Sequence, residues 1–246
     1  MRVITYAEAI REALRLEMRR NPSTLLLGEN VSSQRNPATR GLAEEFGRER
    51  VRDTPISEAG FLGAALGAAI LGLRPIVEVM NIDFALVAMD QLLNQLAKTR
   101  YLSGGRLSAP VTVRAIYGGG RSLGATPSEA LYSLFAHMPG LRVVAPSNPY
   151  DAKGLLTACV RGEDPALFLE HRLLYDVEGP VPPEAYTIPL GVANVLREGD
   201  DVTVVAVGLM VRRALEAADE LRGEVSVESW TSGPSSPSTR RRSSDR

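Results

Sequence analysis

The chain has 246 residues, 44% of them hydrophobic, so it can bury the core of one large domain or two smaller ones. Its formal net charge of -1 gives no basis for a nucleic-acid or anionic-membrane partner. The single cysteine, Cys159, excludes an internal disulfide, and the absence of a signal-peptide core or a membrane-length apolar run favours a cytoplasmic protein.

The first part of the chain alternates helix and strand signals. Thr5, with Glu8 three residues later, is typical of a capping box and predicts an amphipathic helix over residues 7–20. An apolar run over residues 25–28 predicts a short buried strand, and polar residues 31–40 predict a loop. Residues 50–54 then lead to Glu58 at the start of a Gly/Ala-rich helix over 60–71. Small residues at helical spacing indicate either tight packing within the subunit or a subunit interface.

The same alternation continues to residue 170. The patterns predict strands over residues 74–80, 111–114, 141–146 and 166–170. They predict helices over residues 84–101, 128–137 and 151–161, with a flexible loop over 117–126. Strands that alternate with helices favour an α/β fold with a mainly parallel sheet and helices on both faces.

A proline-rich segment divides the chain into two units. It predicts a linker over residues 179–190, after a first domain over residues 1–178. Residues 191–228 then resemble the opening of a second α/β domain that is truncated. We expect a strand over 202–207, a helix over 211–222 and a strand over 224–228.

Several short motifs follow one another in a characteristic order. They include Leu27-Gly28-Glu29, Thr54-Pro55-Ile56-Ser57-Glu58, Met89-Asp90-Gln91, Ser103-Gly104-Gly105, Phe135-Ala136-His137 and Asp151-Ala152-Lys153-Gly154. In combination they resemble the beta subunits of thiamine diphosphate-dependent 2-oxo acid dehydrogenases, a group that includes pyruvate, branched-chain 2-oxo acid and acetoin dehydrogenases. The resemblance runs from about Val3 to Glu228. It implies a pyrimidine-binding domain like that of transketolase, followed by the start of the transketolase C-terminal domain.

The resemblance also implies an active site. Glu58 matches the catalytic carboxyl group that faces the aminopyrimidine ring of the cofactor. Phe84 matches the aromatic residue that packs on this ring, Ile56 and Met80 match apolar walls, and Glu29 matches an acid near the reacting end. From the residues alone, Glu58 could instead be an acid stabilised by the helix dipole, the apolar residues could be core, and Glu29 could be a solvated turn residue.

Cofactor and partners follow from the same resemblance. In this family an alpha subunit holds the diphosphate and its magnesium through a Gly-Asp-Gly…Asn motif, which this chain lacks. We therefore expect half of a thiamine diphosphate site, a second beta subunit, a lipoyl-bearing acyltransferase core and a small 2-oxo acid substrate. Some members also hold a structural potassium ion through backbone carbonyls. Two distant histidines and one cysteine give no zinc signature, and no dinucleotide fingerprint follows a strand.

One position departs from the family pattern. Pro127 stands where the family usually has a histidine near the substrate, about ten residues before the segment that contains His137. The predicted function is oxidative decarboxylation of a 2-oxo acid with acyl transfer to lipoyl groups. The alternatives are a truncated, non-catalytic paralogue that only binds a partner, an acetoin-cleaving enzyme, or half of a split transketolase. His137 and His171 are expected to be structural.

The composition changes abruptly at Ser229. Residues 229–246 have no hydrophobic periodicity and could form a disordered basic tail. A second hypothesis is a frameshift after about Glu228, because one base earlier the codons of Trp230 and Thr231 permit a family-like continuation. The truncated second domain would then expose the edge of its sheet.

Overall fold

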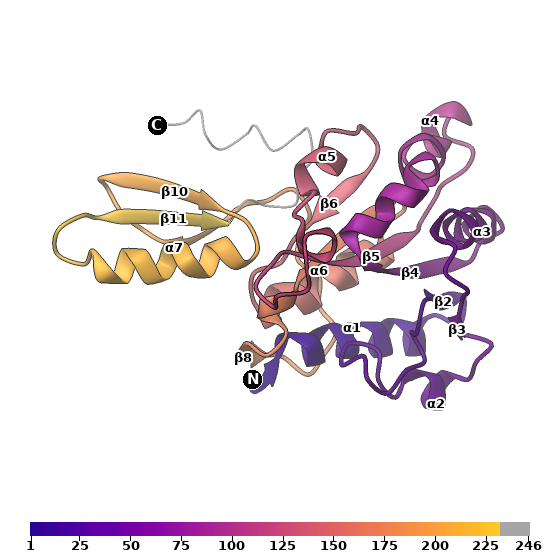
Figure 1. Cartoon of the computed structure of the whole chain (residues 1–246), viewed down its shortest axis with the longest axis horizontal. Helices are drawn as coiled ribbons and strands as arrows, with labels where there is room; N and C mark the ends of the chain where they lie inside the picture. Colours follow the sequence, from indigo (N-terminus) through magenta and orange to yellow (C-terminus); the bar gives the residue numbers. More distant parts are fainter. Residues whose placement is uncertain (232–246) are drawn as a thin grey trace.

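A computed structural model describes residues 1–231 (Figure 1). The helices are α1 (Tyr6–Arg20), α2 (Leu42–Phe46), α3 (Glu58–Ile70), η1 (Ile82–Ala88), η2 (Asp90–Leu96), α4 (Thr99–Leu102), η3 (Thr126–Ser128), α5 (Tyr132–Ala136), α6 (Pro149–Arg161), η4 (Arg172–Leu174) and α7 (Leu209–Glu220). The strands are β1 (Arg2–Thr5), β2 (Thr24–Gly28), β3 (Val51–Asp53), β4 (Arg74–Asn81), β5 (Thr112–Tyr117), β6 (Arg142–Val144), β7 (Ala166–His171), β8 (Glu178–Val181), β9 (Asn194–Arg197), β10 (Val202–Ala206) and β11 (Val227–Thr231).

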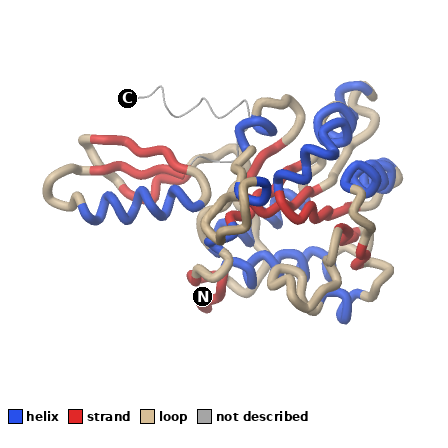
Figure 2. Tube along the Cα trace, viewed as in Figure 1, coloured by secondary structure: helices blue, strands red, loops and turns tan. Residues whose placement is uncertain are grey.

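A six-stranded sheet forms the centre of the first unit, in the order β3-β2-β4-β5-β7-β6. Every neighbouring pair is parallel, which confirms the predicted sheet. One apolar cluster joins the sheet to α1 and α6, and a second joins it to α3, η2 and α5. Helices therefore cover both faces, as Figure 2 shows, and all the parallel strands end at the same edge.

The start of α1 confirms the predicted capping box. The Thr5 hydroxyl accepts a hydrogen bond from the Glu8 backbone N–H at 3.2 Å, and the Glu8 carboxylate accepts one from the Thr5 backbone N–H at 2.9 Å. Both bonds satisfy backbone donors that an uncapped helix leaves free. The buried face of this helix, which includes Ile10 and Leu14, packs on the sheet.

The predicted helix over residues 84–101 is wrong as a single element. The chain forms the 3₁₀ helix η1, the π-helical segment η2 and the short α4 instead. Ile82, Ala85 and Ala88 recur every three residues and are each 0% exposed. This spacing suits the three-residue turn of a 3₁₀ helix, so packing against the sheet overrides the α-helical pattern.

The predicted helix over residues 128–137 is shorter than expected and reduces to α5. The Glu129 carbonyl oxygen accepts a hydrogen bond from the Gly118 backbone N–H at 2.8 Å, and the Glu129 backbone is extended. Because this carbonyl bonds to the end of β5, it does not accept a hydrogen bond within a helix. The helix therefore begins only at Tyr132.

The predicted linker begins as a strand, because β8 pairs with β1 in antiparallel register. The residues after β8 lie over α6, where the Tyr186 ring stacks on Tyr150 with 4.7 Å between centroids. The Lys153 ammonium donates a hydrogen bond to the Pro182 carbonyl at 2.5 Å. A Cβ atom on Gly154 would lie 2.6 Å from the Tyr186 ring, so the glycine permits this close approach. These contacts hold the linker against α6 of the first unit.

The second unit is a small sheet in the order β10-β11-β9 with α7 packed beside it (Figure 1). Strand β10 and helix α7 confirm two predicted elements, whereas β9 was not predicted. The last strand runs to Thr231, three residues into the predicted tail, because its backbone pairs with β10 whatever the side chains are. The rest of that tail lies outside the described residues, and the frameshift stays a prediction.

Candidate functional site

The residues predicted to form the site gather at the carboxyl edge of the six-stranded sheet. Glu29 directly follows β2, and Glu58 opens α3 after β3. Met80 is the second-last residue of β4, and Phe84 lies in η1, which follows that strand. Parallel α/β sheets bind their ligands at this edge, because the loops after neighbouring strands meet there.

Two buried carboxyl groups lie together at the centre of this set. Glu58 is 5% exposed and Glu29 is 8% exposed. Burial raises the pKa of Glu29, and so do the nearby Glu58 charge and a hydrogen bond between the two side chains. Burial and the neighbouring Glu58 therefore favour the protonated form of Glu29.

The backbone geometry before Glu29 depends on a glycine. Gly28 has φ +148°, and a Cβ atom there would lie 2.3 Å from the Glu78 carbonyl oxygen on β4. The missing side chain lets β2 and β4 run close together at their carboxyl ends. This approach sets the position from which Glu29 enters the site.

The predicted apolar residues differ in burial. Phe84 is partly buried against the core cluster, and Met80 is also partly buried. Ile56, in contrast, is 81% exposed, so its side chain contacts little of this chain. The roles of all three toward a cofactor stay predictions.

Pro127 lies in η3, beside the carboxyl ends of β4 and β5. Its carbonyl oxygen accepts a hydrogen bond from Arg172 at 2.6 Å, and Arg172 also donates to Asn81 at 2.8 Å. The sequence analysis missed Arg172 and Asn81. A charged residue directly after a buried strand was the available signal for Arg172, and nothing local marked Asn81.

His171 ends β7 beside this arginine. Its imidazole Nδ1 accepts a hydrogen bond from the Leu173 backbone N–H at 3.2 Å, and its ring packs edge-on against Tyr117 with 4.9 Å between centroids. Burial and the Arg172 charge lower the pKa of His171, which favours the neutral ring. These contacts agree with the expected structural role.

A buried ion triad supports the sheet behind the site. Arg114 donates to Glu170 at 2.7 and 3.1 Å and to Glu78 at 2.8 Å. Tyr175 donates to Glu170 at 2.5 Å, and Asn36 donates to Glu78 at 2.6 Å. Burial lowers the pKa of Arg114, but the two carboxylates outweigh it and the net shift is upward. The triad ties β4, β5 and β7 together beneath their carboxyl ends.

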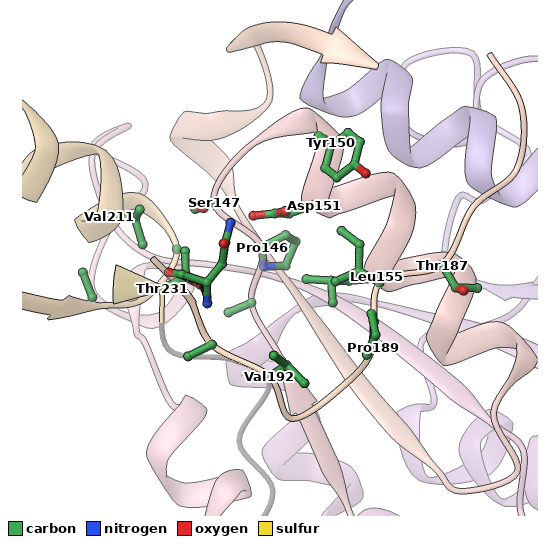
Figure 3. Close-up of a pocket in the computed structure, with 16 residues that line it drawn as sticks. Pro146, Ser147, Tyr150, Asp151, Leu155, Thr187, Pro189, Val192, Val211 and Thr231 are labelled. Carbon is green, nitrogen blue, oxygen red and sulfur yellow. Dashed lines mark hydrogen bonds between the residues drawn. The ribbon is translucent and has the colours of Figure 1, made fainter. Parts of the chain in front are cut away.

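A cavity of about 340 Å³ lies beside the end of the outer strand β6, between the two units (Figure 3). Its polar lining includes Ser147, Asp151 and Thr231. Burial raises the pKa of Asp151, and hydrogen bonds from Asn148 and Ser147 oppose the shift. None of the predicted site residues lines this cavity. They lie at the ends of β2, β3 and β4, whereas part of the cavity lining follows β6, the strand at the far side of the sheet from β3.

Two structural searches of residues 1–231 gave negative results. That part of the chain contains no cluster of three or more His, Cys, Asp or Glu side chains able to hold a metal ion. It also contains no helix with the length and hydropathy needed to cross a membrane.

Comparison with known families agrees with the geometry of the sheet edge. Residues 2–178 match the family model described as the pyrimidine binding domain of transketolase, and residues 191–229 match the model of the transketolase C-terminal domain. The chain therefore belongs to the transketolase pyrimidine-binding family.

Three relatives show the range of the matches. The beta subunit of acetoin:2,6-dichlorophenolindophenol oxidoreductase from Bacillus subtilis is 50% identical over 234 residues, which is 89% of this chain and 68% of the relative. The 2-oxoisovalerate dehydrogenase beta subunit from the same organism is 47% identical and covers 90% and 68%. The beta subunit of its pyruvate dehydrogenase E1 component is 45% identical and covers 90% and 69%.

Solved structures share the fold at lower identity. A split-gene transketolase, solved as an inactive beta4 tetramer, matches with a TM-score of 0.76 and 24% identity over 93% of this chain and 70% of that chain. The transketolase from Leishmania mexicana matches with a TM-score of 0.71 and 16% identity over 95% of this chain and 35% of that chain. At these identities the likeness concerns the fold alone.

Proposed function

We propose that this chain is the beta subunit of a thiamine diphosphate-dependent 2-oxo acid dehydrogenase and supplies the aminopyrimidine half of the active site. The observation that carries the proposal is the pair of buried, adjacent carboxyl groups, Glu29 and Glu58, at the carboxyl edge of the sheet. The helix dipole alone accounts for an acid at the first residue of α3. It does not account for a second buried acid that shares a hydrogen bond with the first.

The residues at this edge suit the cofactor's pyrimidine ring. Glu58 would form a hydrogen bond with the ring, and the buried Glu29 would lie beside it. Phe84, Met80 and Ile56 offer apolar surface for the flat ring. Thiamine diphosphate, when bound, supplies a carbon nucleophile for the 2-oxo carbon and an electron sink for decarboxylation.

The other half of the site belongs to a partner in this proposal. We expect an alpha subunit to hold the diphosphate and its magnesium. The exposed Ile56 suits a site completed by a second chain. A second beta subunit, a lipoyl-bearing acyltransferase core and a small 2-oxo acid complete the proposed assembly, and a structural potassium ion is a further expectation.

The proposed domain division has four parts. Residues 1–178 form the pyrimidine-binding domain, 179–190 the linker and 191–228 the truncated start of the C-terminal domain. Residues 229–246 are an out-of-frame tail in this proposal. The two family matches, at 2–178 and 191–229, support these boundaries. Sequencing the coding DNA across codon 228 tests the frameshift, because an unbroken frame without a missing or extra base would remove it.

Acetoin cleavage is a second candidate, because two acetoin oxidoreductase subunits, from B. subtilis and Cupriavidus necator, share 50% and 48% identity with this chain. The side chain of Pro127 cannot transfer a proton. This residue therefore favours acetoin cleavage, or a non-catalytic partner-binding role, over standard lipoyl transfer. Turnover of pyruvate, branched-chain 2-oxo acids and acetoin by the partnered enzyme separates these candidates.

The test of Glu58 uses the chain assembled with an alpha subunit. Glu58→Gln keeps the shape of the side chain but replaces the carboxyl group by an amide that cannot transfer a proton, so exchange of the cofactor C2 proton into deuterium oxide should slow by at least about 100-fold. Glu163→Gln, at an exposed residue far from the site, is the control. Exchange at the wild-type rate in Glu58→Gln would remove Glu58 from its proposed role.

A further inference from the structure

We propose that Arg172 is a positioning residue that holds the loop of residues 118–128 over the carboxyl ends of β4 and β5. The loop carries Pro127, so Arg172 fixes one wall of the proposed substrate site. The catalytic meaning of this wall rests on the proposed function. The tether itself does not, because it is a property of the folded chain.

The guanidinium group of Arg172 joins three separate segments. Its Nε donates to the Gly118 carbonyl at 2.7 Å, at the point where the loop leaves β5. Its Nη2 donates to the Pro127 carbonyl at 2.6 Å and to the Asn81 side chain at 2.8 Å. One planar cation thus holds both ends of the loop and fastens them to the end of β4. A lysine offers a single nitrogen and cannot reproduce this fork.

The residues on either side of Arg172 shape the same loop by packing. A Cβ atom on Gly118, which has φ +84°, would lie 2.3 Å from the His171 ring. A Cβ atom on Gly120 would lie 2.6 Å from the Leu173 side chain. His171 at the end of β7 and the two residues after it therefore contact the loop through three consecutive side chains, and Arg172 donates hydrogen bonds to it.

A buried acid, Asp83, acts on this cation electrostatically. Asp83 is 6% exposed, and neither of its carboxylate oxygens has a hydrogen-bond partner among the described residues. Burial and the Arg121 charge lower the pKa of Arg172, and the Asp83 charge opposes this shift. Asp83 thus stabilises Arg172 in the charged state.

In this geometry the loop acts through its fixed position and not through the side chain of Pro127. The pyrrolidine ring has no donor, and its carbonyl is already occupied by Arg172. The loop therefore acts as a fixed wall that orients the substrate rather than as a source of protons. Releasing it should weaken substrate binding more than it slows the chemical step.

Amide hydrogen exchange on the full chain tests the tether and does not depend on enzymatic turnover. Arg172→Lys keeps the charge near Asp83 but loses the fork, and Arg172→Met loses both. We expect exchange across residues 118–128 to speed up by about tenfold or more in both variants, while β4 and β5 stay protected. Arg121→Met is the matched control, because it breaks an exposed ion pair between the same loop and Asp176. Asn81→Ala removes one acceptor and should give a smaller increase.

Two results would overturn the tether. The first is amide exchange of residues 118–128 at the wild-type rate in both Arg172 variants, which would show that Arg172 does not hold the loop. Equal loss of protection across the whole sheet in Arg172→Lys would mean that Arg172 stabilises the fold in general rather than the loop.

Kinetics of the partnered enzyme test the functional part separately. Arg172→Lys should raise KM for the 2-oxo acid severalfold and leave kcat within about twofold. Unchanged KM with a released loop would show that the loop is no substrate wall. A wild-type assembly that turns over no 2-oxo acid or acetoin would refute the proposed function, while the exchange result would still decide the tether.

Discussion

Replacing Arg114 by methionine should strongly destabilise the first unit. The arginine side chain is 2% exposed and makes three hydrogen bonds, two to Glu170 and one to Glu78. Methionine fills most of the volume but leaves two buried acids without a cation. Removing one partner of a buried ion pair costs about 3–5 kcal/mol, whereas an exposed pair contributes about 0–1 kcal/mol. The partners that remain, Tyr175 and Asn36, place the expected loss toward the lower end.

Urea unfolding followed by circular dichroism measures this loss. Arg213→Met is the matched control, because Arg213 forms an exposed ion pair with Glu216. The Arg114 variant should unfold at a clearly lower urea midpoint with an unchanged m-value, and the control should not. Replacing Glu78 and Glu170 by glutamine as well should restore much of the stability. A loss below about 1 kcal/mol for Arg114→Met would refute the view that the triad holds charged groups in a poorly solvated interior.

The pH dependence of this deficit follows from the same burial. Burial raises the pKa of Glu78, and the Arg114 charge opposes that shift. Without Arg114 the opposition is lost. A carboxyl group whose folded pKa exceeds its unfolded value stabilises the fold below the unfolded pKa, and this contribution is lost as the pH rises through the folded pKa. The deficit of Arg114→Met should therefore be largest at neutral pH and shrink as the pH falls toward about 4.3.

Three further outcomes are expected. Gly154→Val should push the linker off α6, because its Cβ would lie 2.6 Å from the Tyr186 ring, and limited proteolysis should then cut residues 182–190 faster than in Gly162→Val. Gly28→Ala should lower the melting temperature, because the new methyl group meets the Glu78 carbonyl at 2.3 Å; an unchanged melting curve would contradict that contact. Burial raises the pKa of Cys159 to about 12, so its thiol should react with a disulfide reagent at pH 8 only after unfolding, and rapid labelling of the folded chain would show that it is accessible.

The sequence predicted those parts of the fold that depend on short-range chemistry. The capping box at Thr5 and Glu8 acts within one helical turn, so α1 could be located from a few residues. Apolar runs located five of the six strands of the large sheet, because strands buried on both faces need continuous hydrophobicity. They did not locate β3, whose three residues Val51–Asp53 include only one apolar side chain. The motif around Glu58 indicated the family, and the family matches confirmed it.

Only the tertiary structure decided how distant segments meet. Packing against the sheet split the predicted helix over residues 84–101, and pairing with β10 extended β11 to Thr231. The contact between Glu29 and Glu58 joins the end of β2 to the start of α3, and the bonds of Arg172 join three segments that are apart in the chain. Local patterns carry no information on such contacts, because their energies exist only after the chain has closed long loops and brought those groups together.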